Sequence, residues 1–360
     1  MLIKLLFNWY DMVWIRESFK ERLTKMRVHI TSIYGQSPRS IALISQKLVK
    51  DVGRQLGYDE MGIYFYNDYA ETYGERSTRM DGIIAGLGRG DIVVFQVPTW
   101  NSTEFDELFL DKLQAYGARI ITFVHDIVPL MFESNFYLLD RVIDMYNRSD
   151  VVILPTKAMH DYLIEKGMTT SKVLYQEVWD HPVNIDLPRP EYQKVLSFAG
   201  DIQRFPFVND WKENIPLIYY GDGSRLNSEA NVHALGWKDD VELMLSLSKR
   251  GGFGLCWSED REELVERRYS RMNASYKLST FLAAGLPIIA NHDISSRDFI
   301  KQHGLGFTVE TLEEAVEKIN NMEKETYDSY VENVEKIATL LRNGYITKKL
   351  LIDAVHMLYR

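Results

Sequence analysis

Short apolar runs alternate with segments of helical periodicity along most of the chain. In the first half the runs span 27–34, 63–67, 91–97, 119–125, 151–154 and 173–178. Between them, 40–56, 105–115 and 136–146 repeat apolar side chains at helical spacing. Apolar runs of this length predict buried strands, and helices between successive strands indicate a parallel sheet covered on both faces.

The alternation starts again after a proline-rich break at 181–190, H-P-V-N-I-D-L-P-R-P, where the prolines disfavour regular structure. Apolar runs return at 195–199, 217–220, 232–235, 254–257, 287–290 and 306–309, followed by helical patterns at 312–322, 327–342 and 346–359. We therefore predict two doubly wound, Rossmann-like α/β domains facing a central cleft. Their expected bounds are 26–183 and 195–342, with a linker at 184–194 and a helix at 343–360 that packs at the domain junction.

The last two helical patterns carry leucines that look exposed in the sequence: Leu340, Leu341, Leu350, Leu351 and Leu358. These side chains can pack on the first domain or on another copy of the chain. The second alternative predicts a homo-oligomer.

Composition narrows the class of protein. The 360 residues are 46% hydrophobic and 26% charged, as in soluble globular proteins, and the net charge of −9 excludes a general nucleic-acid binder with a basic surface. Cys256 is the only cysteine, which excludes an internal disulfide and fits a reducing cytoplasm. Residues 1–25 are apolar and then strongly charged; we expect a peripheral N-terminal extension or a mis-assigned start, and no membrane span.

The segment 273–290, N-A-S-Y-K-L-S-T-F-L-A-A-G-L-P-I-I-A, predicts a helix followed by a buried strand. Asn273 or Ser275 can cap the helix, Gly285 suits its left-handed end, and Pro287 stops it. Lys277 falls in the first turn, where a cation opposes the helix dipole. A phosphate between Lys277 and the free backbone N–H groups would explain this placement, and a solvated lysine is the alternative.

Glycine-bearing turns follow other strands of the second half. Arg204 ends the turn 198–204, F-A-G-D-I-Q-R, and can fork onto a diphosphate or be a surface charge. The turns 219–223 and 251–254 match neither G-x-G-x-x-G nor the phosphate-loop pattern, so nicotinamide and phosphate-loop enzymes are not favoured. The histidines show no metal-binding spacing and there is no D-x-D triplet, so we expect no metal site.

In the first half, His125 and Asp126 stand where a strand ends, the place where open sheets present reactive groups. His125 can hydrogen-bond a sugar hydroxyl, and Asp126 can take a proton from an attacking hydroxyl. Alternatively, Asp126 caps a turn and His125 is a satisfied edge residue.

Two other strand ends can border the same cleft on the acceptor side. They carry Tyr34 with Gly35, and Trp100 with Asn101. The indole of Trp100 offers a flat surface on which a sugar can stack, or it belongs to the core.

Taken in order, several motifs of the second half resemble the donor-binding half of GT-B glycosyltransferases: 199–200 with Arg204, Y-G-D-G at 220–223, L-G-W at 235–237, C-W-S-E at 256–259, and 277–290. From Met26 to its end the chain resembles, more specifically, the glycosyltransferase 3 family of the streptococcal serine-rich repeat adhesin pathway. The resemblance implies a cytoplasmic bacterial enzyme that uses UDP-glucose. Its acceptor would be N-acetylglucosamine already attached to serine or threonine of the adhesin.

The resemblance also implies roles for particular residues. Arg204 and Lys277 would neutralise the leaving diphosphate, and Ser275 with adjacent backbone amides would bind its oxygens. The full donor set is Arg204, Tyr220, Gly221, Ser275, Tyr276, Lys277 and Thr280, with Tyr220 and Thr280 beside the uridine or ribose.

One departure from the GT-B pattern concerns the ribose. Many related enzymes carry a Glu-x7-Glu element, whereas this chain has Met272 and Thr280 at those positions. Glu259 or Asp260 can substitute, or can be solvated loop acids, and the stereochemical outcome stays open. Two rival functions also stay open: a non-catalytic subunit that binds glycopeptide or a partner transferase, and a UDP-sugar epimerase.

Overall fold

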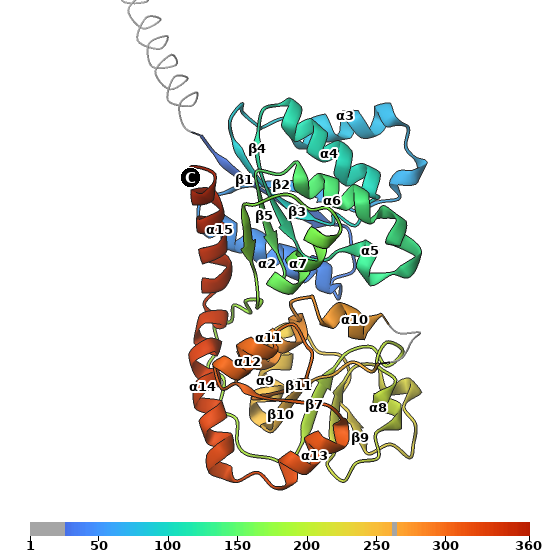
Figure 1. The fold of residues 1–360 in the computed structure, drawn as a ribbon, viewed down its shortest axis with the longest axis vertical. Coiled ribbons are helices and arrows are strands. Elements are labelled where there is room, and N and C mark those ends of the chain that lie inside the picture. Colours follow the sequence, from blue (N-terminus) through green and yellow to red (C-terminus); the bar gives the residue numbers. More distant parts are fainter. Residues whose placement is uncertain (1–25, 261–264) are drawn as a thin grey trace, which may run out of the picture.

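The computed structural model describes residues 26–260 and 265–360, so the expected extension at 1–25 lies outside the described residues. Two six-stranded parallel sheets, each with helices on both faces, lie one beyond the other along the long axis (Figure 1). The predicted α/β architecture of two doubly wound sheets is confirmed.

The first sheet is built by the first half of the chain. Across the sheet its strands are β2 (Asp59–Tyr64), β1 (Val28–Tyr34), β3 (Ile92–Val97), β4 (Arg119–Val124), β5 (Val151–Leu154) and β6 (Val173–Tyr175). Its helices are α2 (Ile41–Gln55), α3 (Tyr73–Ile83), α4 (Thr103–Ala115), α5 (Val128–Met131), α6 (Leu139–Asn147) and α7 (Lys157–Glu165). The central strands are buried along their whole length, which explains why they read as continuous apolar runs.

The strand predicted at 63–67 is displaced in the structure, where β2 covers Asp59–Tyr64. This strand lies at the sheet edge, and it alternates buried Met61 and Ile63 with the more exposed Glu60 and Gly62. Because only one face of an edge strand meets the core, the sequence shows alternation here instead of an apolar run.

The second sheet follows the order β12 (Gly306–Val309), β11 (Ile288–Asn291), β10 (Phe253–Cys256), β7 (Leu196–Ala199), β8 (Leu217–Tyr220) and β9 (Val232–Ala234). Its helices are α8 (Phe207–Asp210), α9 (Asp240–Arg250), α10 (Glu266–Ser270), α11 (Tyr276–Ala283), α12 (Arg297–Gln302) and α13 (Leu312–Asn320). The strand order reverses between β7 and β10, and in the first sheet between β1 and β3. Loops at such reversals open a crevice at the carboxyl ends of the strands.

Two long helices end the chain and reach both sheets. Helix α14 (Lys324–Arg342) packs against α11, and α15 (Tyr345–Met357) packs on α2 and β5 of the first sheet (Figure 1). Asp180 caps α15, accepting the N–H of Thr347 at 2.6 Å. The chain between β6 and β7 has no helix or strand and crosses from one sheet to the other.

The leucines expected at the surface of these helices are mostly buried within the chain. Leu341 and Leu351 have no exposed surface, and Leu350 and Leu358 are 7% and 4% exposed, whereas Leu340 is 38% exposed. Of the two alternatives, Leu350, Leu351 and Leu358 follow the first, since they pack into the core of the first domain. Within the described residues, no helix has the length and apolar character needed to cross a membrane.

Candidate active site

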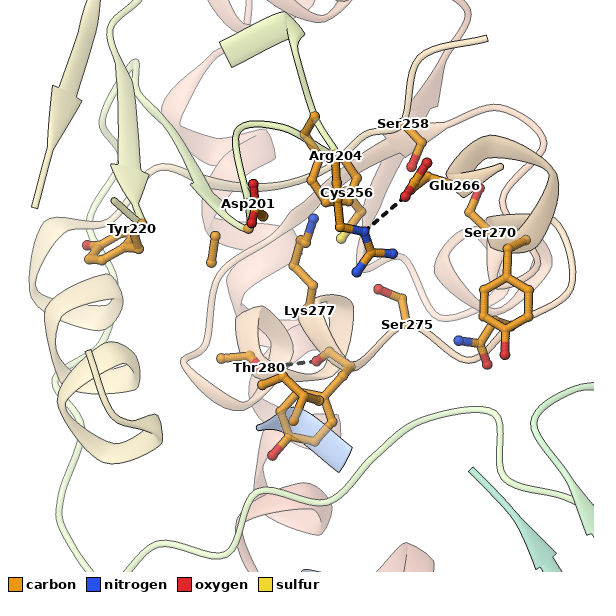
Figure 2. A pocket seen from close by; sticks show the side chains of 18 of the residues that line it. Asp201, Arg204, Tyr220, Cys256, Ser258, Glu266, Ser270, Ser275, Lys277 and Thr280 are labelled. Atoms are coloured by element: carbon orange, nitrogen blue, oxygen red, sulfur yellow. Dashed lines mark hydrogen bonds and ion pairs between the residues drawn. The ribbon is translucent and has the colours of Figure 1, made fainter. Parts of the chain in front are cut away.

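A cleft of about 1040 Å³ lies between the carboxyl ends of the two sheets. From the first domain it is lined by the start of α2, by Trp100 and by the loop after β4. From the second domain it is lined by the turns after β7, β8 and β10 and by the start of α11 (Figure 2). Both reversal points therefore contribute to one cavity.

Helix α11 begins at this cleft. Ser275 caps it, its Oγ accepting the N–H of Leu278 at 3.2 Å. Apart from that of Leu278, the N–H groups of the first turn have no partner inside the helix, so they are available to an anion. Lys277 and Ser275 lie side by side at this helix end, with Arg204 across from them (Figure 2).

Lys277 has an unusual environment for a cation. Its Nζ lies 3.9 Å from the ring centroids of both Phe198 and Phe205. Among the described residues, no carboxylate lies within ion-pair distance of it. Burial lowers the pKa of Lys277 to about 7, and the positive charge of Arg204 acts in the same direction. A bound anion would remove both penalties.

Arg204 stands at the mouth of the same subsite. Its Nε lies 2.9 Å from Oε1 of Glu266, the first residue of α10, and the arginine side chain is 56% exposed. One edge of the guanidinium is held by this contact while the side chain keeps contact with solvent, so Arg204 can turn toward a phosphate without leaving Glu266.

Tyr220, Gly221 and Thr280, all predicted for the donor nucleotide, line the cleft. The Tyr220 hydroxyl lies 3.0 Å from Ser246 Oγ, and Thr280 Oγ1 donates to the Tyr276 carbonyl at 3.0 Å. A Cβ on Gly221 would lie 2.7 Å from the Gly200 carbonyl oxygen, so no side chain fits where these two turns meet.

Asp126 is held from the other domain. Its Oδ1 accepts the hydroxyl of Tyr269 at 3.0 Å, and that hydroxyl also accepts the N–H of Ile127 at 3.1 Å. Burial raises the pKa of Asp126 to about 6, against the effect of the Tyr269 hydrogen bond and of Arg204. A carboxylate with this pKa is well matched to a general base near neutral pH.

His125 lines the cleft but is already engaged. Its Nε2 lies 2.8 Å from Gln96 Oε1, and its Nδ1 lies 3.1 Å from Ser45 Oγ. The ring packs on Trp179, and burial lowers the pKa of His125 to about 3, so the imidazole is neutral. This differs from the expected contact with a sugar hydroxyl, because both ring nitrogens have partners inside the protein. The arrangement matches the alternative of a satisfied histidine at a strand end.

The residues predicted for the acceptor side are only partly brought together. Trp100 lines the cleft, whereas Tyr34, Gly35 and Asn101 do not. Tyr34 donates to Glu60, and the ring of Tyr64 covers Gly35, where a Cβ would lie 2.7 Å from that ring.

Asn101 is occupied by its own domain as well. Its Oδ1 accepts the N–H of Tyr66 at 3.1 Å. Position at a strand end therefore did not suffice to place Asn101, Tyr34 or Gly35 in the cleft, because each turns toward the sheet edge.

Several cleft residues were missed by the sequence analysis: Arg39, Trp179, Trp237, Asp240, Glu266 and Tyr269. Tyr269 and Glu266 belong to α10, a five-residue helix too short to give a periodic signal. Trp237 lay within the quoted L-G-W motif but had no role assigned to it. Within the described residues, no group of three or more His, Cys, Asp or Glu side chains is placed to hold a metal ion.

Comparison with known proteins finds a family match for each half of the chain. Residues 27–178 match the family model of the glucosyltransferase 3-like N-terminal domain, and residues 196–354 match that of the C-terminal domain. Glucosyltransferase 3 of Streptococcus gordonii is 46% identical over 330 residues, covering 92% of this chain and 98% of that protein. Glucosyltransferase 3 of Streptococcus parasanguinis is 43% identical with the same coverage.

Solved structures agree in fold. Anabaena HepE in complex with UDP-glucose has a TM-score of 0.62 at 12% identity, covering 92% of this chain and 100% of that one. Sucrose-phosphate synthase from Thermosynechococcus elongatus has a TM-score of 0.65 at 9% identity, covering 93% and 99%. The predicted GT-B architecture is thus confirmed, and the chain belongs to the glucosyltransferase 3-like family of glycosyltransferases.

Proposed function

We propose that the protein transfers glucose from UDP-glucose to N-acetylglucosamine on serine or threonine of a serine-rich repeat adhesin. The observation that carries the donor side is Lys277, a half-buried cation at a helix N-terminus and beside Arg204, with no carboxylate partner among the described residues. Two cations and free backbone N–H groups form a site for a diphosphate, the leaving group of a nucleoside diphosphate sugar.

Charge on the leaving diphosphate grows as the glycosidic bond breaks. Lys277 and Arg204 stabilise that charge from two directions. We propose that this pair takes the place that a divalent ion holds in other transferases, so that no added metal is required.

The acceptor hydroxyl approaches from the first domain. Asp126 stands at the end of β4, and its raised pKa allows it to remove the proton of an attacking hydroxyl. Its contact with Tyr269 of α10 forms when the two domains are together. Because this contact joins the two domains, we propose that catalysis is coupled to domain closure.

The choice of glucose as the donor sugar and of the adhesin as the acceptor is inferred from related proteins. The two streptococcal relatives are named glucosyltransferase 3, and the HepE neighbour was solved with UDP-glucose. The acceptor comes from the resemblance to the adhesin pathway, as does the bacterial cytoplasmic location. The homo-oligomeric state comes from the leucines of the last two helices, of which Leu340 is 38% exposed. Light scattering of the purified chain measures the oligomeric state.

The test is a transfer assay. The full chain is incubated with UDP-glucose and a serine-rich peptide bearing N-acetylglucosamine, with a chelator present, and the peptide is weighed by mass spectrometry. We expect a gain of one hexose that is lost in Arg204→Ala and Lys277→Ala. Matched controls are Arg250→Ala and Lys301→Ala, which remove exposed cations of the same domain.

Each rival function has its own outcome in this assay. Binding of UDP with no transfer from any UDP-sugar would support the non-catalytic subunit. A changed sugar on UDP in the absence of peptide would support the epimerase. Transfer that stops on addition of chelator would overturn the metal-free mechanism while leaving the transferase in place.

A further inference from the structure

A hydrogen-bonded histidine–aspartate pair lies beside the donor cleft and takes no part in the mechanism above. His181 Nδ1 lies 2.8 Å from Oδ2 of Asp240 and 3.1 Å from its Oδ1. The His181 side chain has no exposed surface, whereas the Asp240 side chain is 28% exposed and lines the cleft. One carboxylate therefore meets the imidazole on one side and the cleft on the other.

Both partners are fixed from outside the pair. Asp240 is the first residue of α9, and Asp239 caps that helix by accepting the N–H of Glu242 at 2.9 Å. The His181 backbone N–H donates to the Leu341 carbonyl at 3.0 Å. The Asp240 carboxylate is consequently held in one place by a histidine that is itself anchored to α14.

The pair reaches the wall of the nucleotide site. His181 Nε2 lies 3.4 Å from Oγ1 of Thr280, so the imidazole links Asp240 to α11. Thr280 stands nearly one helical turn beyond Lys277, which marks the diphosphate subsite. The His181 ring therefore lies between Asp240 and Thr280, on the side of α11 that lines the proposed nucleotide site.

The direction of the nucleoside follows from the two ends of the cleft. In a nucleotide sugar the nucleoside and the transferred sugar extend from opposite ends of the diphosphate. Figure 2 shows Glu266 and Ser270 on one side of Lys277, and Tyr220 on the other. Asp126 is held by Tyr269 of the same α10, so the transferred sugar belongs on the α10 side. The nucleoside then extends toward Tyr220, Thr280 and α9.

Other acids that line the cleft already have local partners. Asp201 and Asp222 accept backbone N–H groups of their own turns, from Gln203 and Ser224, and Glu266 holds Arg204. Asp240 differs from the exposed Asp201 and Asp222 in that a fully buried imidazole holds its carboxylate beside α11, and acceptor positions remain for hydroxyl groups of a ligand.

We propose that Asp240, positioned by His181, accepts hydrogen bonds from the ribose hydroxyls of the donor nucleotide. The inference rests on the proposed nucleotide-sugar function and deepens it. It supplies from α9 the carboxylate that α11 lacks, because Met272 packs against the core of the first domain and Thr280 carries no charge.

Calorimetry with UDP, 2′-deoxy-UDP and 3′-deoxy-UDP tests the proposal on the full chain. A hydrogen bond to a charged group is worth enough that the parent should prefer UDP over at least one deoxy analogue by about 10-fold or more. In Asp240→Ala this preference should fall below about 2-fold, through weaker binding of UDP alone. Asp240→Asn keeps the size and an acceptor for His181, and its preference should be intermediate.

Asp239→Ala is the matched control, because it disturbs the start of the same helix without lining the cleft. It should keep the preference of the parent. If the parent does not discriminate, or if Asp240→Ala discriminates as well as the parent does, the ribose role is overturned while UDP binding stands. If the parent binds no UDP at all, the proposed function itself fails.

Discussion

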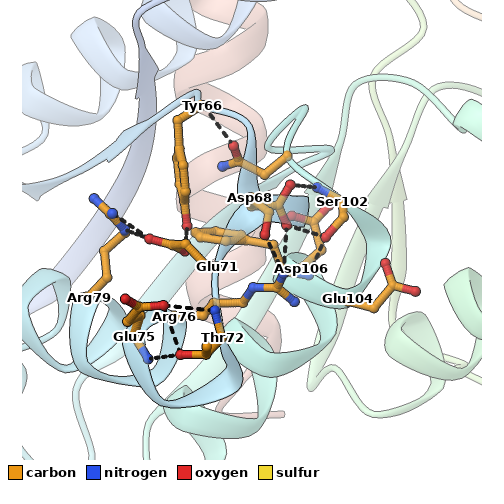
Figure 3. A network of polar contacts seen from close by, with 12 residues as sticks. Tyr66, Asp68, Glu71, Thr72, Glu75, Arg76, Arg79, Ser102, Glu104 and Asp106 are labelled. Atoms are coloured by element: carbon orange, nitrogen blue, oxygen red, sulfur yellow. Dashed lines mark hydrogen bonds and ion pairs between the residues drawn. The ribbon is translucent and has the colours of Figure 1, made fainter.

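Two groups of partly or fully buried ionisable side chains in this molecule differ in one respect, which is whether the protein itself supplies their polar partners. In the first domain, a network around η1 (Asp68–Ala70) gives the acids Asp68, Glu71 and Asp106 polar partners from the protein itself (Figure 3). Asp68 accepts the N–H of Ser102 at 3.1 Å and lies 3.4 Å from Arg76, and Asp106 accepts the hydroxyl of Thr99. In the second domain Lys277 has no such partner among the described residues.

The difference separates structure from function. Burying a charge is costly unless it is paired and hydrogen-bonded. Asp68 meets that condition through Arg76 and Ser102, whereas Asp106 has only the hydrogen bonds of Thr99, and burial raises the pKa of Asp106 to about 7. Both acids hold the loop that carries Trp100, whose φ of 62° is unusual for a residue with a side chain. Among the described residues Lys277 has two aromatic faces beside it but no carboxylate, which leaves its ammonium group available to an anion from outside the chain. Substitutions in the two places should therefore have opposite effects on activity and stability.

The largest effect on activity is expected from Lys277→Met. Loss of one preorganised charge at the leaving group should lower kcat/KM for UDP-glucose by about 1000-fold. Stability should not fall, because methionine fills similar space beside Phe198 and Phe205 without a charge to desolvate. Initial rates and thermal unfolding measure the two effects. A loss of stability comparable to the loss of activity would show that Lys277 is structural.

The same substitution has a pH signature. With a folded pKa of about 7 against 10.5 for a free lysine, the unfolded chain binds more protons at Lys277 throughout that window. The parent should gain stability from this group as pH rises from about 7 to 10.5. The gain in free energy of unfolding of Lys277→Met over the parent should thus be greatest below pH 7 and vanish above the unfolded pKa. Lys301→Met is the control, and its stability relative to the parent should not change over this pH range.

A smaller but still large effect is expected from Asp126→Asn. If Asp126 is the general base proposed above, its loss should lower kcat by about 100-fold while UDP binding is retained. In the parent, kcat should fall as pH drops below about 6, because Asp126 then takes up a proton. The variant should lack this acidic limb. Persistence of the limb in the variant would assign it to another group.

Asp68→Asn tests the paired side of the comparison. Removing one partner leaves Arg76 buried without its carboxylate, and the free energy of unfolding should fall by about 3 kcal/mol. The KM for UDP-glucose should stay within about 2-fold, since the network is remote from α11. Glu75→Gln, at the exposed start of α3, is the control, expected to cost less than about 1 kcal/mol. A raised KM with unchanged stability would contradict the division between the two groups.

The sequence predicted features that depend on neighbouring residues, and it missed contacts between residues that are distant along the chain. Buried strands and the start of α11 were predicted because apolar runs, a cap and a misplaced lysine are local signals. Asp126 was found from its strand end, but its partner Tyr269 was not, because that contact depends on how two domains meet. Tyr34 and Asn101 also stand at strand ends, yet their side chains find partners within the sheet edge, which spacing along the chain does not reveal.

The smallest effect is expected where a cleft cation already has a partner. The guanidinium of Arg39, just before α2, lies 4.8 Å from the ring centroid of Trp237, so the contact joins the two domains across the cleft. Trp237 is 48% exposed, and a cation–π contact at such a site is worth about 0.5–1 kcal/mol. Arg39→Ala should therefore raise the KM for UDP-glucose by about 2- to 5-fold with kcat little changed, because closure becomes less favourable. Arg250→Ala should leave KM unchanged. A fall in kcat as large as that of Lys277→Met would instead place Arg39 on the diphosphate, and a paired cation would then share the role assigned here to the unpaired one.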